Sequence, residues 1–546
     1  MAIVMKGTGA APCKAACPAC IDIPRYIRFI AEGKTRQALD VIRAKVPFPS
    51  VLGRVCPRPC ESECRRRELD EAVSICHLKR FVADFHENLW SHHLQPRPPA
   101  RSSNGKNVAV IGSGPSGLTS ACYLANLGYS VTVFEAMSRP GGMMAFGIPS
   151  YRLPRDVLET EIRLIPSSVM MRFGTRIESL DGLFDQGFQA VFIALGAQES
   201  IRPGIRGEDS SGVMDGLSLL RDMNLGREVR LGKKVAVIGG GNVAVDCSRS
   251  ALRLGAEEVI VIYRRSRIEM PAYPEEIELA LREGVNFLFL SAPKSIVPDE
   301  ARLKLELIRM ELGEPEAGGR KRPIPIRGSE FDVTFDNVIV AVGQRPNIPK
   351  AFRLALTPQG TIQVDPENLE TSRKGVFAGG DVVSGPSSVI HAIAMGRKAA
   401  GSVDQYLGGE GLIDLVPAPP MEKTQVPYGN ETIYRNRVLL SMLEKKKCVE
   451  SFSEVIQGYN LNQAMEEAQR CLRCDQQVLV QVDLERCGQC YTCQMACSLS
   501  YLKACNPEKA RIKIAPDEIQ WKEDCVSGCS FCIQSCSRGA LSLGGG

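Results

Sequence analysis

A glycine-rich unit that occurs twice limits the fold of this 546-residue chain more than any other feature. In the first copy, an apolar run at 108–111 leads into a glycine loop that starts at Gly112, then a helix-like stretch, and then a second apolar run that ends at Glu135. This order of strand, loop, helix and strand predicts a dinucleotide-binding βαβ unit. A glycine turn with a purely structural role is the alternative.

The residue types of the first copy each have a mechanical role. Gly112 allows a tight turn, Gly114 lets the backbone approach a pyrophosphate, and Gly117 permits close packing of the helix on the strand. The amide groups at the start of that helix hold the anion. Glu135 is placed to accept a hydrogen bond from a ribose hydroxyl. The predicted binding residues of this copy are Gly112, Gly114, Pro115, Ser116, Gly117 and Glu135.

The second copy has the same order but ends in basic residues. After an apolar run at 235–238 it reads Gly-Gly-Gly-Asn-Val-Ala, and its second run ends in Tyr263-Arg-Arg. An acid at this place would bind the ribose 2′-hydroxyl, whereas a guanidinium group suits a 2′-phosphate. The arginines therefore favour NADP over NAD, although arginines also serve NAD enzymes by lying along the adenine. The predicted binding residues are Gly239, Gly241, Asn242, Val243, Arg264 and Arg265.

A later segment indicates that the second nucleotide domain is inserted into the first. Residues 375–381 read as a strand that ends in Gly379-Gly380-Asp381, just before another helix-like stretch. Such a strand would complete the first sheet, and Asp381 would then bind the cofactor together with the amides of the next helix. A solvated aspartate in a turn is the alternative. Apolar runs that alternate with helices predict an α/β fold with parallel, doubly wound sheets.

The 21 cysteines are the second informative feature, because most lie in two sets at 13–76 and 471–536. The C-terminal set contains two runs with the spacing C-x2-3-C-x2-C-x3-C, which is typical of two-cluster ferredoxins. The fourth cysteine of each run typically ligates the other cluster. We therefore assign Cys487, Cys490, Cys493 and Cys536 to one 4Fe-4S cluster, and Cys525, Cys529, Cys532 and Cys497 to another. A zinc module is the alternative, but it would use separate CxxC pairs.

The middle of the chain resembles a known family. The motifs that carry this resemblance are Glu-Ala-Met-Ser-Arg-Pro-Gly-Gly142-Met, Gly-Ile-Pro-Ser-Tyr-Arg-Leu-Pro, Tyr-Arg-Arg-Ser-Arg with Glu-Met-Pro-Ala, and Gly-Gly380-Asp381. They are similar to the body of the glutamate synthase small (beta) subunit, which dihydropyrimidine dehydrogenase and a ferredoxin:NADP oxidoreductase subunit share. The resemblance covers residues 13 to about 405. It implies FAD in the first site, with its flavin near 140–147 and Gly142, and a nicotinamide cofactor that docks from the second.

The N-terminal cysteines are similar to the helical two-cluster domain that precedes the flavin body in those families. One CxxC pair of the relatives is missing before Cys13, and a matching pair, Cys471 and Cys474, stands near the other end. The resemblance implies one composite cluster held by Cys13, Cys64, Cys471 and Cys474. Cys17, Cys56 and Cys60 would hold another, with Cys20, Cys76 or a non-cysteine residue as its fourth ligand. The alternative is that Cys471 and Cys474 bind zinc or nothing.

Near the C-terminal cysteines, the segment Asn506-Pro-Glu-Lys-Ala-Arg-Ile-Lys-Ile also resembles the small ferredoxin subunits of tungsten and molybdenum enzymes. Serines follow Cys497 and Cys536, where proline is common in that pattern. Two short alternating stretches, at 510–514 and 519–522, could pair as a hairpin. The predicted domains are a helical iron–sulfur domain (1–98), an FAD domain in two parts (106–205 and 346–408), an NAD(P) domain (206–345), a linker with the CxxC pair (409–478) and a ferredoxin-like α+β domain (479–546).

Composition narrows the class of protein further. The net charge of +5, from 67 basic and 62 acidic residues, is too small to predict a nucleic-acid partner. No run of 18 apolar residues and no secretory signal is evident, so we expect a cytoplasmic protein without a membrane span. Clustered cysteines there are metal ligands more often than disulfides.

These parts predict an electron-transfer oxidoreductase. It would pass electrons between NAD(P)H and a partner through FAD and 4Fe-4S clusters, two at the C-terminal end and one or two at the N-terminal end. We expect a subunit of a hetero-oligomer whose partner is another protein subunit, such as a tungsten or molybdenum enzyme, or a ferredoxin. A glutamate synthase beta subunit and an iron–sulfur scaffold protein are the alternatives. The pattern indicates no catalytic side chain.

Overall fold

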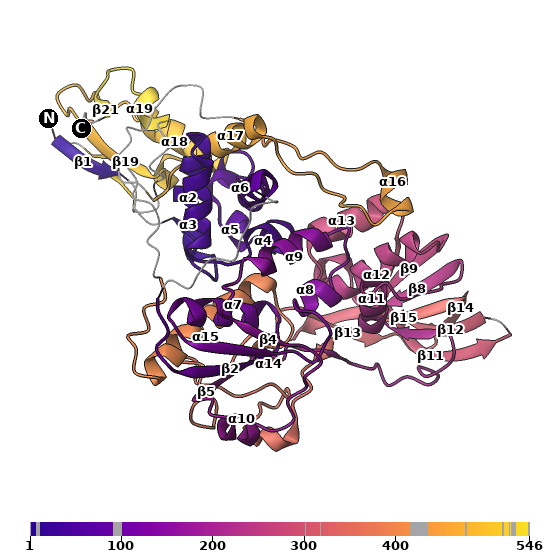
Figure 1. The fold of residues 1–546 in the computed structure, drawn as a ribbon. Helices are drawn as coiled ribbons and strands as arrows, with labels where there is room; N and C mark the ends of the chain where they lie inside the picture. Colours follow the sequence, from indigo (N-terminus) through magenta and orange to yellow (C-terminus); the bar gives the residue numbers. More distant parts are fainter. Residues whose placement is uncertain are drawn as a thin grey trace. The chain divides into compact units, whose positions relative to one another are not determined.

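The computed structural model describes residues 2–6, 11–90, 101–300, 302–316, 318–414, 435–475, 478–515, 518–522, 525 and 531–543. The chain divides into two compact units. One, here called the α/β unit, contains residues 94–415 and 441–457. The other, here called the cysteine-rich unit, contains residues 1–93, 416–440 and 458–546. Figure 1 shows the ribbon coloured along the sequence, from indigo at the N-terminus to yellow at the C-terminus.

The first sheet of the α/β unit consists of five parallel strands. Their order is β17 (Val376–Ala378), β5 (Ala190–Ile193), β2 (Asn107–Ile111), β3 (Ser130–Phe134) and β4 (Met170–Arg172). Helices α7 (Pro115–Asn126) and α15 (Val389–Tyr406) pack against each other beside it. The shorter helices are α8 (Met143–Phe146), α9 (Arg155–Arg163), α10 (Asp181–Asp185), η3 (Lys350–Phe352) and α14 (Asp381–Ser384). Apolar side chains on the sheet, among them Ile111, Val191 and Ala378, form one core.

The second sheet also consists of five parallel strands. Their order is β10 (Asn286–Phe289), β9 (Glu258–Tyr263), β8 (Lys234–Ile238), β15 (Asn337–Val340) and β7 (Val213–Asp215). Its helices are α11 (Gly216–Asn224), α12 (Asn242–Arg253), η2 (Arg267–Glu269) and α13 (Pro274–Glu283). Val235, Val261 and Ile339 belong to its core on the side of α12 and α13. The two sheets confirm the predicted α/β fold with two Rossmann-like domains.

The chain path confirms that one domain is inserted into the other. Strand β17 completes the first sheet, although it follows the whole second sheet in the sequence. Where the chain leaves the first domain and returns to it, β6 (Glu199–Ser200) and β16 (Gln344–Arg345) pair antiparallel. The insertion is therefore joined to its host by two strands that run side by side.

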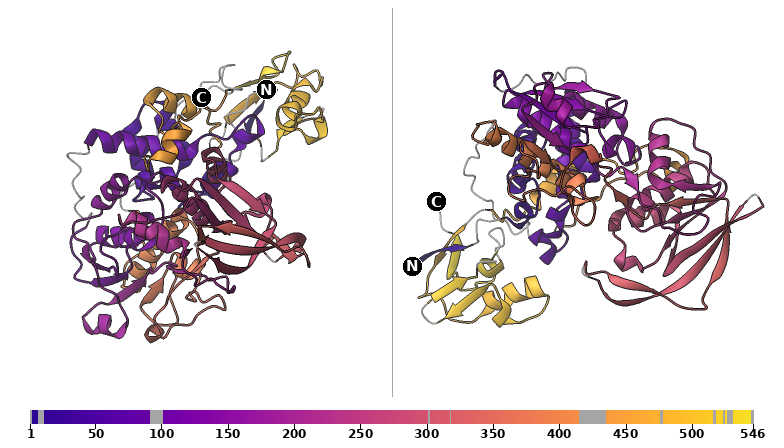
Figure 2. Two further views of the ribbon diagram at one scale, coloured as in Figure 1. Left: turned by 90° about the vertical axis from the view of Figure 1, so that its right-hand side faces the viewer. Right: turned by 90° about the horizontal axis from the view of Figure 1, so that it is seen from below.

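The inserted domain also carries an antiparallel layer that the sequence pattern did not predict. It contains β11 (Ser291–Asp299), β12 (Arg302–Pro315), β13 (Lys321–Pro325) and β14 (Phe331–Phe335), with β12 paired to each of the others. Figure 2 shows these long strands from two further sides. Leu303, Leu305 and Leu307 of β12 are buried against Ala236 and Val338 of the parallel sheet. A short helix, α16 (Lys445–Glu450), packs against α12 and α13.

Helices form the N-terminal part of the cysteine-rich unit. They are α1 (Pro12–Ala15), α2 (Ile23–Ala31), α3 (Thr35–Arg43), α4 (Pro49–Val55), α5 (Pro59–Ser62), η1 (Arg65–Glu68) and α6 (Ile75–Trp90). Gly33, with a φ of +72°, separates α2 from α3. Helix α17 (Leu461–Gln469), from the far end of the chain, packs against α2 and α6. Distant parts of the sequence therefore build one domain.

The C-terminal part of this unit is a small α+β module. Its elements are β18 (Val478–Val482), α18 (Thr492–Leu502), η5 (Pro507–Lys509), β19 (Ile512–Ala515), β20 (Glu518–Trp521), α19 (Phe531–Gln534) and β21 (Leu541–Leu543). The predicted hairpin is confirmed, because β19 and β20 pair antiparallel. Strand β1 (Ala2–Lys6) adds to the edge of β18, so both ends of the chain lie in one sheet (Figures 1 and 2). No helix in the described part of the chain has the length and apolar character needed to cross a bilayer.

Candidate functional site

The first glycine loop is packed so tightly that two of its glycines cannot be replaced without movement. Gly112 has a φ of +101°, and a Cβ atom there would lie 2.4 Å from the carbonyl oxygen of Ala194. A Cβ atom on Gly117 would lie 2.0 Å from the carbonyl oxygen of Gly112. Gly112 therefore makes the tight turn, and Gly117 allows the close packing of the helix, as the sequence predicts.

Gly114 differs from its neighbours, because a Cβ atom there would meet nothing within 4 Å. Its backbone is extended at the N-cap of α7, so the open side of the loop faces the helix N-terminus, where Pro115 and Ser116 begin the first turn. Gly142, with a φ of +53°, lies against the loop; a Cβ atom on it would be 2.7 Å from Cα of Gly114. The glycine at 114 thus leaves a space that a pyrophosphate could occupy.

The carboxylate of Glu135 holds the loop at the end of β3. Its Oε2 accepts hydrogen bonds from the amide and the hydroxyl of Ser113, and its Oε1 accepts one from the amide of Met137. Glu135 is buried, with 7% of its surface exposed. The residue is therefore at the predicted place, and it also fixes the backbone of the loop.

Asp381 lies where β17 gives way to α14, next to the same helix N-terminus. A Cβ atom on Gly380 would lie 3.0 Å from Cβ of Ser116. Burial raises the pKa of Asp381 to about 6, while a hydrogen bond from the amide of Ser387 lowers it. The buried hydroxyl of Ser116 has no hydrogen-bond partner among the described residues. An unpaired buried hydroxyl beside free helix amides fits the polar groups of a bound dinucleotide.

The second glycine loop repeats this construction at the end of β8. Gly239 has a φ of +146°, and a Cβ atom on it would lie 2.2 Å from the carbonyl oxygen of Ala341. Gly241 is the N-cap of α12, and Val243 lies half-buried in its first turn. The Oδ1 atom of Asn242 accepts a hydrogen bond from the amide of Tyr273. Asn242 therefore also fixes the loop that leads into α13.

The two arginines after β9 have different surroundings. Arg264 is exposed. Arg265 is buried, pairs with Glu316 at 2.9 Å and donates to the carbonyl oxygen of Lys321 at 2.7 Å. Of the two, only Arg264 is thus placed to reach a ligand without breaking an ion pair that the structure already contains.

Four cysteines from both ends of the sequence line one cavity of the cysteine-rich unit: Cys13, Cys64, Cys471 and Cys474. Burial raises the pKa of Cys13, and the nearby thiols of Cys471, Cys64 and Cys474 raise it further. Burial likewise raises the pKa of Cys471 to about 11. Four such thiols would lose their protons together only if a metal centre took up the charge. The set thus has the donor chemistry of the predicted composite cluster.

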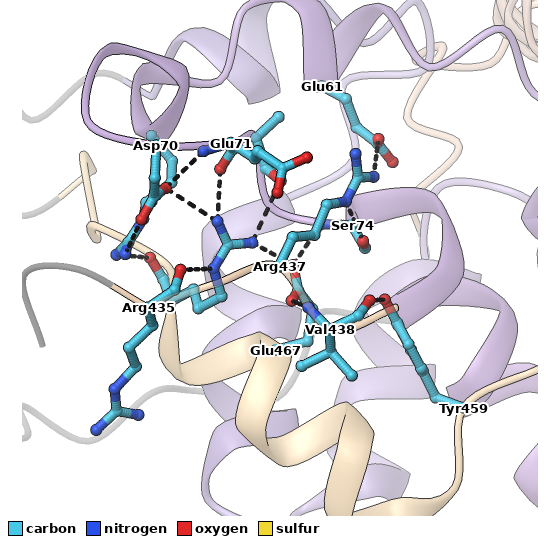
Figure 3. Close-up of polar contacts among 12 residues, drawn as sticks. Glu61, Asp70, Glu71, Ser74, Arg435, Arg437, Val438, Tyr459 and Glu467 are labelled. Atoms are coloured by element: carbon cyan, nitrogen blue, oxygen red, sulfur yellow. Dashed lines mark hydrogen bonds and ion pairs between the residues drawn. The ribbon is translucent and has the colours of Figure 1, made fainter. Parts of the chain in front are cut away.

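Arg470, next to Cys471, anchors this segment to the N-terminal helices. Its guanidinium group is fully buried and pairs with Glu467 at 2.7 Å and Asp70 at 3.0 Å. It also donates to the carbonyl oxygens of Glu71, Ala72 and Arg435. Figure 3 shows polar contacts of this region, with Asp70, Glu71, Arg435 and Glu467 among the labelled residues. The ion-pair network explains why the CxxC pair folds back onto Cys13.

A second group of thiols lies around helix α6. Cys17, Cys56, Cys60 and Cys76 are all buried, whereas Cys20 is exposed. The ammonium group of Lys79 is buried beside them. Burial alone would lower the pKa of Lys79, but negative charge on Cys56, Cys76 and Cys60 raises it. The structure thus places the three predicted ligands together with a fourth cysteine.

The C-terminal module gathers its cysteines in one core. Cys493, Cys497 and Cys532 are buried there, and Cys487 and Cys536 pack against it. Burial, followed by Cys532 and Cys536, raises the pKa of Cys493 to about 12. Cys490 is exposed and Cys525 is buried, while Cys529 lies outside the described residues. Among the described residues, no group of three or more Cys, His, Asp or Glu side chains is arranged to hold a single metal ion.

The comparisons with known proteins agree with this architecture. Family models match for the 4Fe-4S domain II of dihydropyrimidine dehydrogenase (residues 7–89), an NAD(P)-binding Rossmann-like domain (110–173) and pyridine nucleotide-disulphide oxidoreductases (157–396). The small chain of NADPH glutamate synthase from Azospirillum brasilense is 35% identical, over 72% of this chain and 86% of its own. This chain belongs to the glutamate synthase small-chain family.

Two further relatives match a larger part of the chain. The beta subunit of the NADP(+)-dependent formate dehydrogenase of Moorella thermoacetica is 43% identical, over 85% of this chain and 70% of its own. The beta subunit of the NADPH-Fe(3+) oxidoreductase of Geobacter sulfurreducens is 40% identical, over 85% and 75%. The chain is accordingly an NAD(P)H-dependent iron–sulfur flavoprotein oxidoreductase with an electron-transfer function.

The sequence pattern did not predict roles for Arg470 and Lys79 in these sites. The contacts that reveal them join parts of the chain that are distant in the sequence, such as Arg470 with Asp70. A charged residue directly beside a cysteine, as in Arg470-Cys471, is the sequence signal that could have pointed to such a role.

Proposed function

We propose that this chain is the NADPH-oxidising or NADP-reducing subunit of a larger electron-transfer complex. It would carry one FAD, one nicotinamide site and four 4Fe-4S clusters. The observation that supports this most directly is the cavity lined by Cys13, Cys64, Cys471 and Cys474. A cluster there would be held by both ends of the chain, which ties the C-terminal ferredoxin-like module to the N-terminal iron–sulfur domain.

The residues divide the work between two nucleotide sites. In the first, the amides at the start of α7, together with Gly114, Gly142 and Asp381, would hold the diphosphate and ribityl part of FAD. In the second, the start of α12 would hold the diphosphate of the nicotinamide cofactor, and Arg264 its 2′-phosphate. FAD, when bound, supplies the exchange between a two-electron hydride and single electrons. The protein binds both cofactors and sets their orientation.

The cysteine-rich unit has the contacts expected of a fixed electron path. Leu69 and Leu472 form an apolar cluster against which Cys474, Tyr501 and Phe531 pack. Tyr501 belongs to α18 of the C-terminal module, and Phe531 precedes the cluster ligand Cys532. Arg511 of the module pairs with Glu68 at 2.5 Å, and the ammonium group of Lys503 donates to the carbonyl oxygen of Leu69 at 3.0 Å. These contacts favour a built-in module over a free carrier.

The relatives favour one partner class over the other candidates. The formate dehydrogenase and NADPH-Fe(3+) oxidoreductase beta subunits match 85% of the chain, whereas the glutamate synthase small chain matches 72%. We therefore infer a hetero-oligomer in which another subunit, such as a tungsten or molybdenum enzyme, exchanges electrons with the C-terminal module. A glutamine-dependent partner is the second candidate. The two nucleotide sites argue against a scaffold protein.

Anaerobic purification of the chain with its bound partners tests the proposal. The complex should contain flavin and iron, and it should reduce a viologen dye with NADPH faster than with NADH. Metal analysis should detect tungsten or molybdenum in the partner. A complex without flavin, or one in which neither nicotinamide reduces the dye, would contradict the proposal.

A further inference from the structure

The sequence does not decide which residue is the fourth ligand of the cluster that Cys17, Cys56 and Cys60 would hold. The packing of α4 on α6 helps to decide it. A Cβ atom on Gly53 would lie 2.5 Å from Cβ of Arg80, so the two helices touch at backbone distance. This contact brings the end of α4, where Cys56 is the C-cap, beside the start of α6. The thiol of Cys76 donates to the carbonyl oxygens of Leu52 at 3.2 Å and Gly53 at 3.4 Å, in the last turns of the helix that ends at Cys56.

The other cysteine candidate, Cys20, differs from this group in its exposure to solvent. Cys20 is exposed and has a φ of +50°, and its amide donates to the carbonyl oxygen of Cys17. Cys76, in contrast, is 1% exposed, and Cys17, Cys56 and Cys60 are all below 10%. A buried, water-free set of four thiols is the surrounding that a structural or electron-transfer cluster requires.

Two non-cysteine side chains near the group, Glu61 and His77, already make other contacts. Glu61 accepts a hydrogen bond from the amide of Cys76 with Oε1 and pairs with Arg437 at 2.8 Å through Oε2. His77 is buried, and its ring packs in a T-shaped arrangement with the ring of Tyr459. Successive helical residues point about 100° apart, so His77 and Cys76 cannot both face the thiols.

Lys79 provides an independent observation. It lies three residues after Cys76, on the same face of α6, and only 6% of its surface is exposed. A buried ammonium group needs negative charge nearby, because its transfer out of water costs several kcal/mol. Four neutral thiols do not supply that charge, whereas the four thiolates of a bound cluster do.

We propose that Cys76 is the fourth ligand of the second N-terminal 4Fe-4S cluster, which Cys17, Cys56 and Cys60 also hold. On binding, the Cys76 thiol would lose its proton to water and its sulfur would bond to one iron. Lys79 would then be the buried counter-charge of the cluster. This inference rests on the proposed function, since it deepens the assignment of the iron–sulfur centres.

The test compares Cys76→Ala with the matched variant Cys20→Ala in the anaerobically purified full chain. The readouts are iron per flavin and the electron paramagnetic resonance spectrum of the reduced protein. Cys76→Ala should lose between one and about four irons per chain, or convert one cluster to a three-iron form, whereas Cys20→Ala should match the wild type. Loss in Cys20→Ala with an unchanged Cys76→Ala would overturn the proposal, and so would wild-type iron and spectra in both variants.

Two further measurements keep failure of folding apart from loss of a ligand. Cys76→Ser preserves the size of the side chain, so it should fold with full FAD content and still show an altered cluster spectrum. A Cys76→Ser protein with the wild-type spectrum would contradict the assignment. The wild-type iron count separates this inference from the proposed function: a wild-type chain without any N-terminal cluster contradicts both, whereas a normal wild type with an unaffected Cys76→Ser contradicts only the ligand assignment.

Discussion

Cys13 and Cys471 line the same cavity, although they stand near opposite ends of the chain. Cys13 lies in the short helix α1, and Cys471 follows the end of α17, which packs on α2 and α6. A centre built from both ends joins the two halves of the cysteine-rich unit.

Replacing the distant pair should remove one cluster. We expect the double variant Cys471→Ser with Cys474→Ser to lose about four irons per chain while it keeps its FAD, because only the composite site uses these thiols. Cys505→Ser is the control, since Cys505 is exposed and outside every proposed ligand set. An unchanged iron count in the double variant would show that the pair is not a ligand pair.

Arg470 should be needed for the stability of the same segment. Arg470→Met removes a fully buried guanidinium and leaves Glu467 and Asp70 without it, which should cost about 3–5 kcal/mol of unfolding free energy. The control Arg36→Ala breaks an exposed ion pair with Asp40 and should cost less than about 1 kcal/mol. Chemical unfolding followed by circular dichroism and by cluster absorbance measures both variants. Equal stability of the two variants would contradict the role of Arg470 as an anchor.

The two glycines at 114 and 117 should fail in different ways. Gly114→Ala has open space, so it should fold but bind FAD at least 10-fold more weakly, because its methyl group enters the place of the diphosphate. Gly117→Ala meets a backbone oxygen at 2.0 Å and should fold poorly with or without flavin. Flavin content and thermal unfolding of the apoprotein distinguish the two. Full FAD binding by Gly114→Ala would place the cofactor elsewhere.

Arg264 should determine the choice of nicotinamide. Loss of a charge-assisted hydrogen bond to a 2′-phosphate costs about 1.5–3 kcal/mol, so Arg264→Ala should raise the KM for NADPH about 10- to 100-fold and leave the KM for NADH nearly unchanged. Arg265→Ala, which breaks the ion pair with Glu316, should instead lower the unfolding free energy. Steady-state dye reduction with each nicotinamide measures the first effect. An equal change in both KM values would remove Arg264 from the phosphate site.

Asp246 should make the stability of the α/β unit depend on pH. Burial raises its pKa from 3.8 to about 6, although Arg152 at 2.7 Å lowers it in part. The folded state then binds more protons than the unfolded state between these values, so the stabilisation is complete below pH 3.8 and is lost as the pH rises through about 6. Asp246→Asn should flatten the unfolding free energy between pH 4 and 6, whereas Asp222→Asn at the surface should not. A slope that Asp246→Asn leaves intact would refute this.

Local pattern was sufficient for much of the fold. The glycine pattern predicts each Rossmann-like domain. The roles of glycines such as Gly112 and Gly117 depend only on a turn and on close packing within about 30 residues, so a local pattern is enough to identify them. The return of β17 was predictable, because its strand ends in Gly379-Gly380-Asp381 just before another helix, a pattern that fits the nucleotide-binding edge of the first sheet. The antiparallel layer of β11 to β14 and the addition of β1 to β18 were not, since strand pairing depends on long-range contacts that periodicity does not report.

The candidate sites divide in the same way. Spacing predicts which thiols are candidate ligands, and the CxxC pair that is missing before Cys13 suggests Cys471 and Cys474. Spacing could not choose between Cys20 and Cys76, because that choice depends on the crossing of α4 and α6 at Gly53. It also could not separate Arg264 from Arg265, since adjacent residues after a strand diverge only once the partner Glu316 is placed.

The number of electrons that one chain accepts tests the whole account most directly. In an anaerobic coulometric titration of the purified full chain, FAD takes up two electrons and each 4Fe-4S cluster takes up one. Four clusters and one flavin predict about six electrons per chain, and about five in the double variant Cys471→Ser with Cys474→Ser. A wild-type chain that accepts about four electrons or fewer, or a double variant that accepts as many as the wild type, would contradict it.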